Sequence, residues 1–244
     1  GVASAGWTAA HRPSVAFPAP VGASNPLNAT DPVLRRSMYF NGAARVIVPP
    51  QDKLMSVDWT LQAWVCPANG SNGGVIVRRY VTDPQMGGDG VNYEMGLGNN
   101  ATAGYLRPYV LYQPKAKAAV RVDGTGATDV ICSNVSERIE IPIGQWSHVG
   151  ATYSSTENRL AIYVNGVRVA YRTDVTDDPP TMFSTISGVR GDEITIGASR
   201  SVGAITQGFE GWIDELIIRN TPLNVGQMFS SFSLAPKAAQ KTTA

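Results

Sequence analysis

The chain has 244 residues, of which 43% are hydrophobic and 16% are charged. Its 20 basic and 19 acidic residues leave a net charge of +1, so no overall field attracts nucleic acid or acidic lipid. No apolar run is long enough for a membrane-spanning helix. The low charged fraction, with many small and hydroxyl residues, is typical of exported proteins, and we expect an extracellular or cell-surface protein whose secretion signal has been removed before Gly1.

The first 36 residues differ from the rest of the chain, because they contain five prolines and few large apolar side chains. Such a segment cannot fold alone. Val15, Phe17 and Val21 nevertheless alternate with alanine or proline with a period of two, as in a strand. Prolines 18 and 20 remove N–H groups from one edge of that strand and leave the other edge able to pair. The pattern predicts an extended arm over residues 1–36 that adds as an edge strand to a neighbouring subunit.

Short strands separated by turn residues fill the chain from residue 37 to residue 223. Asn165-Gly166 is the strongest hairpin signal, since both residues tolerate the positive φ angles of a two-residue turn. Ten or more strands without a long helix predict an all-β, two-sheet antiparallel jelly-roll sandwich. After Pro222, residues 225–232 fit one helical turn, and we assign residues 224–244 to a short C-terminal tail. The strands are expected over residues 37–42, 45–50, 59–66, 74–80, 92–97, 105–112, 130–132, 145–153, 159–164, 167–171, 193–197 and 211–219.

The chain has two cysteines, Cys66 and Cys132, which are too few for a structural zinc site with four ligands. In a secreted protein we expect them to form a disulfide, and the alternative is two buried free thiols. Four N-x-[ST] sequons also point outside the cytosol and predict N-linked glycans on some of their asparagines. These asparagines are Asn28, Asn69, Asn100 and Asn134.

Several segments, in this order, carry a family resemblance: Tyr39-Phe-Asn-Gly42, Trp59-Thr-Leu-Gln-Ala-Trp64, Gly144-Gln-Trp-Ser-His148, Leu160-Ala-Ile-Tyr-Val-Asn-Gly166, Ile194-Thr-Ile-Gly197 and Phe209-Glu-Gly-Trp-Ile-Asp214. Across residues 37–223 the chain resembles the laminin-G-like, concanavalin A-like lectin/glucanase jelly-roll family. The resemblance implies two packed antiparallel sheets and a role in binding carbohydrate or protein. It also implies, in many members, a structural calcium ion.

The resemblance places such a calcium ion near Asn41 and Asp214, whose side-chain oxygens are of the kind that Ca²⁺ accepts. The family more often has Asp at the first position, so Asn41 removes a charge and should weaken binding. The alternative is that Asp214 only hydrogen-bonds a neighbouring loop.

A catalytic function is not expected. The hydrolytic branch of the fold resembles an E-x-D-x-x-E strand, whose alternate carboxylates serve as nucleophile and acid, and no E-x-D occurs in this chain. His148, beside Trp146, is interpreted as a core or face residue. Five tyrosines could form a sugar-stacking platform, although an ordinary sandwich core is the stronger interpretation: Tyr80, Tyr93, Tyr105, Tyr109 and Tyr112.

Two functions follow from these observations. The first is a non-enzymatic extracellular protein, glycosylated, that assembles into an oligomer, filament or surface layer through strand exchange of its arm. The alternative is a calcium-dependent, lectin-like module that binds carbohydrate as part of a larger secreted protein. Neither function requires nucleic acid or a membrane span.

Overall fold

The computed structural model describes residues 14–16, 37–49, 54, 56–83, 88–100, 102–113, 120–132, 139–175, 193–201 and 204–233. These residues form seventeen strands and one helix. The elements are β1 (Ser14–Ala16), β2 (Ser37–Asn41), β3 (Val46–Val48), β4 (Trp59–Pro67), β5 (Gly74–Asp83), β6 (Gly88–Asn99), β7 (Tyr105–Tyr112), β8 (Val120–Val122), β9 (Val130–Ile131), β10 (Ile141–Pro142), β11 (Ser147–Ser154), β12 (Arg159–Val164), β13 (Val167–Arg172), β14 (Ile194–Ile196), β15 (Ser199–Ser201), β16 (Ala204–Thr206), β17 (Glu210–Arg219) and α1 (Val225–Ser233).

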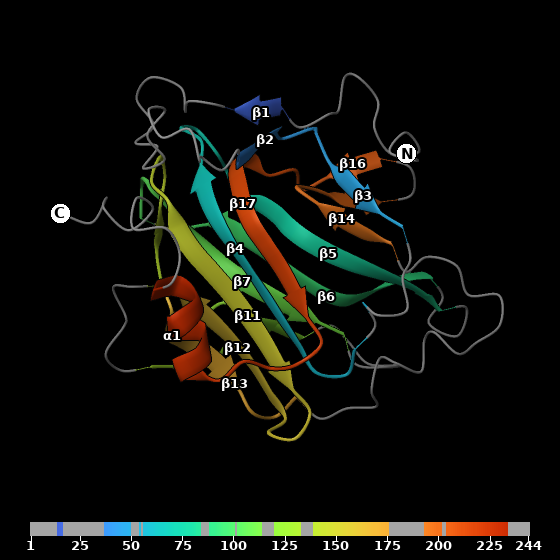
Figure 1. Ribbon diagram of the computed structural model, residues 1–244, viewed down its shortest axis with the longest axis vertical. Helices are drawn as coiled ribbons and strands as arrows, with labels where there is room; N and C mark the ends of the chain where they lie inside the picture. The colour runs from blue at the N-terminus through green and yellow to red at the C-terminus, as the bar shows by residue number, and fades with distance from the viewer. Residues whose placement is uncertain are drawn as a thin grey trace.

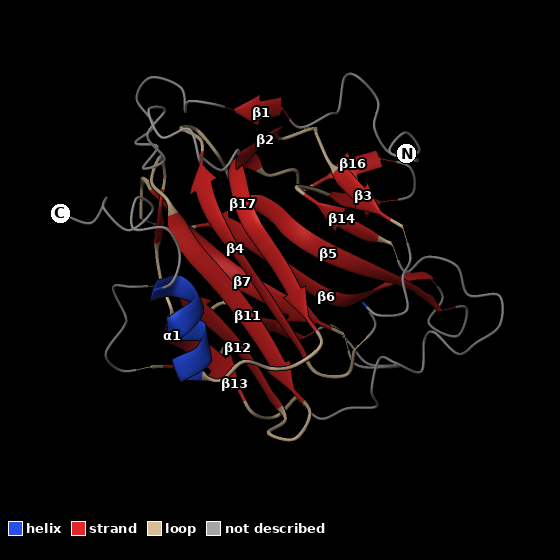
Figure 2. Ribbon diagram, in the orientation of Figure 1, coloured by secondary structure: helices blue, strands red, loops and turns tan. Residues whose placement is uncertain are grey.

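Two antiparallel sheets pack face to face, which confirms the predicted all-β jelly-roll sandwich (Figures 1 and 2). Sheet A has the strand order β1-β2-β17-β4-β11-β12-β13-β9. Sheet B has the order β10-β7-β6-β5-β14-β3, with β8 also paired to β7. Strands β15 and β16 form a separate hairpin. Within the part of the chain that the structure describes, no helix is long and apolar enough to cross a membrane.

The core lies between the two sheets and is centred on a group of aromatic rings. Trp59 of β4 packs against Tyr93 of β6, with ring centroids 5.4 Å apart. Tyr112 of β7 stacks on Tyr153 of β11 across the sandwich at 4.3 Å. These side chains are fully buried because alternate residues of each strand face the opposite sheet. Tyr93 and Tyr112 therefore belong to the core, as the stronger of the two interpretations predicted.

Helix α1 is longer than the single predicted turn and covers part of the outer face of sheet A (Figure 1). Asn224 begins it with a capping box: its Oδ1 accepts a hydrogen bond from the Gln227 N–H, and the Gln227 side chain accepts one from the Asn224 N–H, both at 2.9 Å. Met228 packs against Ala161 and Tyr163 of β12. The cap and this apolar contact stabilise the two turns that follow Pro222.

Three residues of the arm, Ser14–Ala16, form an edge strand on the chain's own sheet. β1 pairs with β2, with Val15 opposite Met38 and Ala16 opposite Ser37. The edge position agrees with the proline pattern, but the pairing partner in the structure is β2 of the same chain. The other two predicted arm residues, Phe17 and Val21, lie outside the described residues.

The predicted Cys66–Cys132 disulfide is absent, because both cysteines are free thiols. Cys66 is on β4, and Cys132 directly follows β9, which is separated from β4 by three strands of sheet A. Four strand spacings correspond to about 19 Å, whereas a disulfide needs Cα atoms within about 7 Å. Burial raises the pKa of the Cys66 thiol to about 12. The alternative of two buried free thiols fits Cys66, whereas Cys132 is a free thiol that is only partly buried.

Candidate functional site

The outer face of sheet B carries a strip of polar and aromatic side chains along β6 and β7, which we call the outer strip. On β7, Leu106 and Val110 point into the core, so Tyr105, Arg107 and Tyr109 face outwards. They lie opposite small residues of β6, with Tyr109 opposite Gly96 and Arg107 opposite Gly98. Arg121 of β8 and Arg78 of β5 flank the strip, since β8 and β5 are the neighbouring strands.

Glu94 is the charged centre of the outer strip. Its side chain is only 1% exposed, and both carboxylate oxygens have a partner. Oε2 accepts a hydrogen bond from Arg78 at 2.9 Å, and Oε1 accepts one from the Tyr109 hydroxyl at 2.8 Å. Burial, followed by the charge of Glu94, raises the pKa of Tyr109 well above its usual value. Tyr109 therefore keeps its proton and donates it in the hydrogen bond to Glu94.

Arg78 connects this centre to the β15–β16 hairpin. Its guanidinium also donates to the Ser199 hydroxyl at 3.1 Å and lies 4.6 Å above the centre of the Tyr80 ring. The Tyr80 and Ser199 hydroxyls are 3.0 Å apart, within hydrogen-bond distance. Three contacts from three directions fix the guanidinium, which is the arrangement that a preorganised binding group requires.

Glycines on β6 allow the Tyr109 ring to lie across the sheet. A Cβ atom at Gly96 would lie 2.6 Å from the Tyr109 Cζ and hydroxyl and 2.8 Å from the Gly74 carbonyl oxygen. At Gly98 the nearest atom would be the end of the Arg121 side chain, at 3.4 Å. Because Gly96 leaves room for the ring, the Tyr109 hydroxyl reaches Glu94, which lies two residues before Gly96 on β6.

Arg121 is the most exposed charged group of the outer strip, with 45% of its side chain accessible. Its guanidinium lies 3.9 Å above the centre of the Tyr109 ring, a cation–π distance. Its Nε donates to Asp123 Oδ2 at 2.8 Å. The strip thus has two layers: Glu94 and Tyr109 are buried, and Arg121 lies over them.

A second polar group lies where β6 turns into β7. Glu140 Oε1 accepts hydrogen bonds from the Asn100 amide and the Thr102 hydroxyl, both at 2.8 Å. Arg107 donates to Asn100 Oδ1 at 3.4 Å. Tyr105, the first residue of β7, is 39% exposed beside this group. We call these residues, Asn100, Thr102, Tyr105, Arg107 and Glu140, the β6–β7 corner.

The chemistry of the outer strip is that of binding. A glycosidase needs one carboxyl group that donates or accepts a proton and a second that attacks or activates water. Both oxygens of Glu94 already accept a hydrogen bond, one of them from an arginine. The strip instead presents fixed hydrogen-bond donors and acceptors beside aromatic rings.

The residues predicted to hold calcium do not form a shared site. Asn41 lies opposite Glu210, and Asp214 is four residues further along β17, or about 13 Å. Asn41 Oδ1 already accepts hydrogen bonds from the N–H groups of Ala43 and Ala44. Asp214 Oδ1 accepts a hydrogen bond from the Glu215 N–H at 2.8 Å. The alternative interpretation of Asp214 is likewise a hydrogen bond, to a neighbouring loop. No group of three acidic, histidine or cysteine side chains among the described residues could hold a metal ion, so the pair does not fit one calcium ion.

The predicted glycosylation sites differ in their surroundings. Asn69 is exposed in the turn after β4, as a glycan attachment site requires. Asn100 is half-buried, and its amide is bound to Glu140. Asn28 and Asn134 lie outside the described residues. Glycosylation of the four sequons stays a prediction.

His148 lies on the outer face of sheet A, in an aromatic cluster that also reaches α1. Its ring centroid is 5.4 Å from that of Trp64 on β4 and 6.1 Å from that of Phe232 on α1. The side chain is buried, and burial lowers the pKa of His148 to about 4. As the sequence predicted, it is a packed face residue and is neutral at pH 7.

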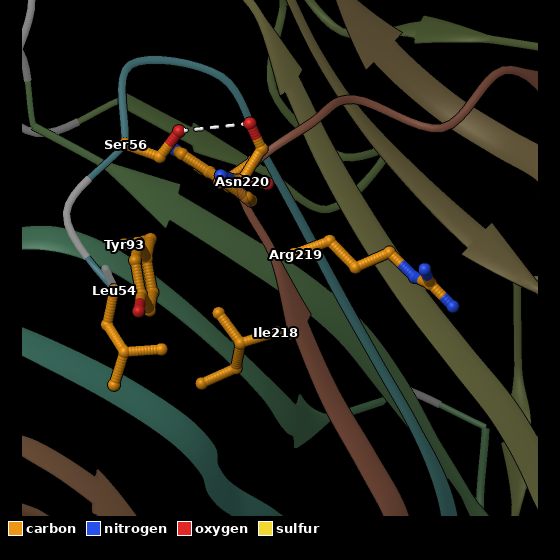
Figure 3. A pocket seen from close by; sticks show the side chains of 7 residues that line it. Leu54, Ser56, Tyr93, Ile218, Arg219 and Asn220 are labelled. Carbon is orange, nitrogen blue, oxygen red and sulfur yellow. Dashed lines mark hydrogen bonds between the residues drawn. The ribbon is translucent and has the colours of Figure 1, made fainter.

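A small pocket opens at one end of the sandwich (Figure 3). Ser56 donates a hydrogen bond to the Asn220 carbonyl at 3.2 Å across its rim. The space inside it is about 10 Å³, no more than a single water molecule needs. The outer strip is therefore the better candidate for a ligand site. The pocket is lined by Leu54, Ser56, Trp59, Tyr93, Ile218, Arg219 and Asn220.

The sequence analysis missed the Arg78–Glu94 pair. A signal was present, because both residues interrupt apolar strand segments, in Gly74-Val-Ile-Val-Arg78 and Tyr93-Glu-Met95. The register that places them opposite each other was not readable, since β5 and β6 contain irregularities between Val75 and Val77 and between Arg79 and Tyr80.

Comparison with known proteins agrees with this architecture. The model of a family described as the concanavalin A-like lectin/glucanases superfamily matches residues 40–228. A search of the curated proteins finds no match.

Three solved structures illustrate the likeness in fold. A heptameric SAP-like pentraxin from Limulus polyphemus has a TM-score of 0.51 and 18% identity, over 74% of this chain and 73% of its own. The CBM40 of the Ruminococcus gnavus IT-sialidase has a TM-score of 0.51 and 13% identity, over 73% of this chain and 84% of its own. The binding domain of botulinum neurotoxin serotype G has a TM-score of 0.52 and 12% identity, over 82% of this chain and 42% of its own. At these identities the likeness concerns the fold alone.

Proposed function

Since the chain belongs to the concanavalin A-like lectin/glucanases superfamily, we propose that it is a non-catalytic carbohydrate-binding module whose ligand lies on the outer strip of sheet B. The proposal includes a location outside the cell, where the hydroxyl-rich, weakly charged composition and the sequons are most typical. Calcium dependence is not included, because Asn41 and Asp214 do not form a shared site.

The observation that carries the proposal is the buried Glu94 on the outer face of a sheet, bound to Tyr109, over whose ring the exposed Arg121 lies. Removing a carboxylate from water costs several kcal/mol unless charges and hydrogen bonds compensate it. Here Arg78 and Tyr109 compensate the cost of burying Glu94, and the three side chains form a rigid support on which Arg121 lies, over the Tyr109 ring. Such a support orients hydrogen-bond donors towards solvent, where a ligand with many hydroxyl groups can accept hydrogen bonds. A CBM40 domain with this fold supports the choice of carbohydrate.

An array of immobilised glycans, followed by calorimetry with the best ligand, tests the proposal. The Arg121→Ala variant removes the exposed donor and keeps Glu94, Arg78 and Tyr109, so we expect at least tenfold weaker binding and a nearly unchanged melting temperature. Arg159→Ala, at the start of β12 in the other sheet, is the control and should bind as the wild type does. A chain that binds no glycan on the array, or an Arg121→Ala variant with full affinity, would contradict the proposal.

Self-assembly through the arm is the second candidate function. β1 lies at the end of sheet A and contributes only three residue pairs, so a neighbouring chain could supply the same strand by exchange. Removal of residues 1–36 should then leave a folded monomer, while the full chain forms oligomers in analytical ultracentrifugation at high concentration. If both sediment as monomers, the arm does not assemble the protein.

A further inference from the structure

The outer strip and the β6–β7 corner contain both basic and acidic side chains in equal number. Arg78, Arg107 and Arg121 lie among the carboxylates of Glu94, Asp123 and Glu140, and two of the arginines are paired with a carboxylate. Arg78 is bound to Glu94 at 2.9 Å, and Arg121 to Asp123 at 2.8 Å. Arg107 donates to the Asp123 carbonyl and to Asn100 Oδ1. None of these three guanidinium groups is left without an oxygen from the chain itself.

This balance disfavours an anionic ligand. A sulfate, phosphate or carboxylate group is bound most strongly by an arginine fork with no competing acid. At Arg78 or Arg121, such a group would have to displace Glu94 or Asp123 and would then lie beside a released carboxylate of the same sign. At Arg107 it would lie near Glu140, which binds the same Asn100 side chain as Arg107 does. Hydroxyl groups avoid this cost, because each hydroxyl both donates and accepts and can join an arginine and a carboxylate that stay paired.

Within this charge pattern, the β6–β7 corner has the parts that hold a sugar ring. Tyr105 is an aromatic residue that is 39% exposed, and it follows a turn at Gly104, where an added Cβ atom would have nothing within 4 Å. Asn99 pairs with Leu106, so the next residue, Asn100, comes opposite Tyr105. Glu140 fixes the Asn100 amide through a 2.8 Å hydrogen bond.

Arg107 is the adaptable group of this corner. Its two hydrogen bonds are both 3.4 Å long, beyond the usual 2.7–3.2 Å range for an N–H donor. Arg107 therefore gives up only weak hydrogen bonds when it turns to a ligand hydroxyl, whereas Arg78 and Arg121 are held by shorter contacts.

We propose that the ligand is an uncharged glycan, and that one of its sugar rings stacks on Tyr105 while its hydroxyl groups bind Arg107, Asn100 and Glu140. The inference rests on the proposed function, which names the outer strip as a carbohydrate site, and it adds the class of glycan and the residues of one subsite. Tyr105 supplies the apolar contact, and the three polar side chains fix the orientation of the ring.

Calorimetry with the full chain tests the inference, using neutral oligosaccharides and acidic ones that carry sialic or uronic acid. We expect binding of a neutral glycan with less than a twofold change in Kd between 50 and 500 mM NaCl. Tyr105→Ala should weaken this binding at least tenfold, whereas Tyr105→Phe keeps the ring and should stay within threefold of the wild type. Phe229→Ala is the matched control, because Phe229 is an exposed aromatic residue, 51% accessible, on α1 of the other face.

The outcomes distinguish a failure of the inference alone from a failure of the proposed function. Binding of acidic glycans alone, weakened more than tenfold by the added salt, overturns the uncharged ligand but leaves a carbohydrate-binding module. If the Tyr105→Ala variant binds a neutral glycan as tightly as the wild type does, the proposed subsite is overturned, but the uncharged glycan remains the ligand. The absence of any glycan binding overturns the proposed function, and the inference with it.

Discussion

Replacement of Glu94 by alanine is expected to lower the free energy of unfolding by about 3–5 kcal/mol, the usual cost of removing one partner of a buried ion pair. The variant leaves Arg78 without its carboxylate and the Tyr109 hydroxyl without its acceptor. The Glu94→Gln variant keeps an oxygen for Tyr109 but removes the charge, and it should lose less stability. Urea unfolding followed by circular dichroism measures both variants.

The control for this experiment is an ion pair on the surface. Glu157 pairs with Arg159, but half of its side chain is exposed. Exposed pairs contribute at most about 1 kcal/mol, so Glu157→Ala should unfold nearly as the wild type does. If Glu94→Ala costs no more than Glu157→Ala, Glu94 is not the structural centre of the outer strip.

Acid is expected to destabilise the fold through His148 before the lowest pH values are reached. The pKa of His148 is about 4 in the folded chain, against an ordinary value of 6.5. Below pH 6.5 the unfolded chain therefore binds a proton that the folded chain excludes. The stability from the neutral side chain is fully present above pH 6.5 and is lost as the pH falls towards 4, by about 3 kcal/mol in total.

His148→Phe separates this effect from the titration of the carboxylates. Phenylalanine keeps a ring against Trp64 and Phe232 but has no proton to bind. Urea unfolding of both proteins between pH 7 and pH 4 gives the difference in their stabilities. We expect this difference to shift by about 3 kcal/mol in favour of the variant as the pH falls. Parallel stability curves would show that His148 does not titrate in this range.

Local sequence signals predicted much of the fold. Asn165 and Gly166 both have positive φ angles, 50° and 77°, and form the two-residue turn between β12 and β13. The length of α1 was underestimated, because its stability comes from Met228 packing on β12, a tertiary contact that the local sequence does not reveal. The β15–β16 hairpin was missed for a similar reason, since three-residue strands carry little periodicity.

The candidate site was less predictable than the fold. Tyr105 and Tyr109 lie on one face of β7, as residues an even number of positions apart do, but this spacing does not say which face of the sheet is the outer one. Glu94, Arg78 and Arg121 come from three strands, and only the strand order and register bring them together. The expected disulfide is not formed, and the two residues expected to hold calcium lie about 13 Å apart along β17, because proximity across the sheet was inferred without that register. Calcium binding itself stays a prediction.

The two free thiols differ in their accessibility to thiol-reactive dyes. Cys66 is buried in the aromatic cluster with Trp64 and Trp212, and its raised pKa leaves almost no thiolate at neutral pH. Cys132 is only partly buried. A maleimide dye therefore attaches to native wild-type protein at a single known position, without the removal of any cysteine. A fluorophore on Cys132, beside β9 at the far end of sheet A from β1, would report exchange of the arm between chains by energy transfer.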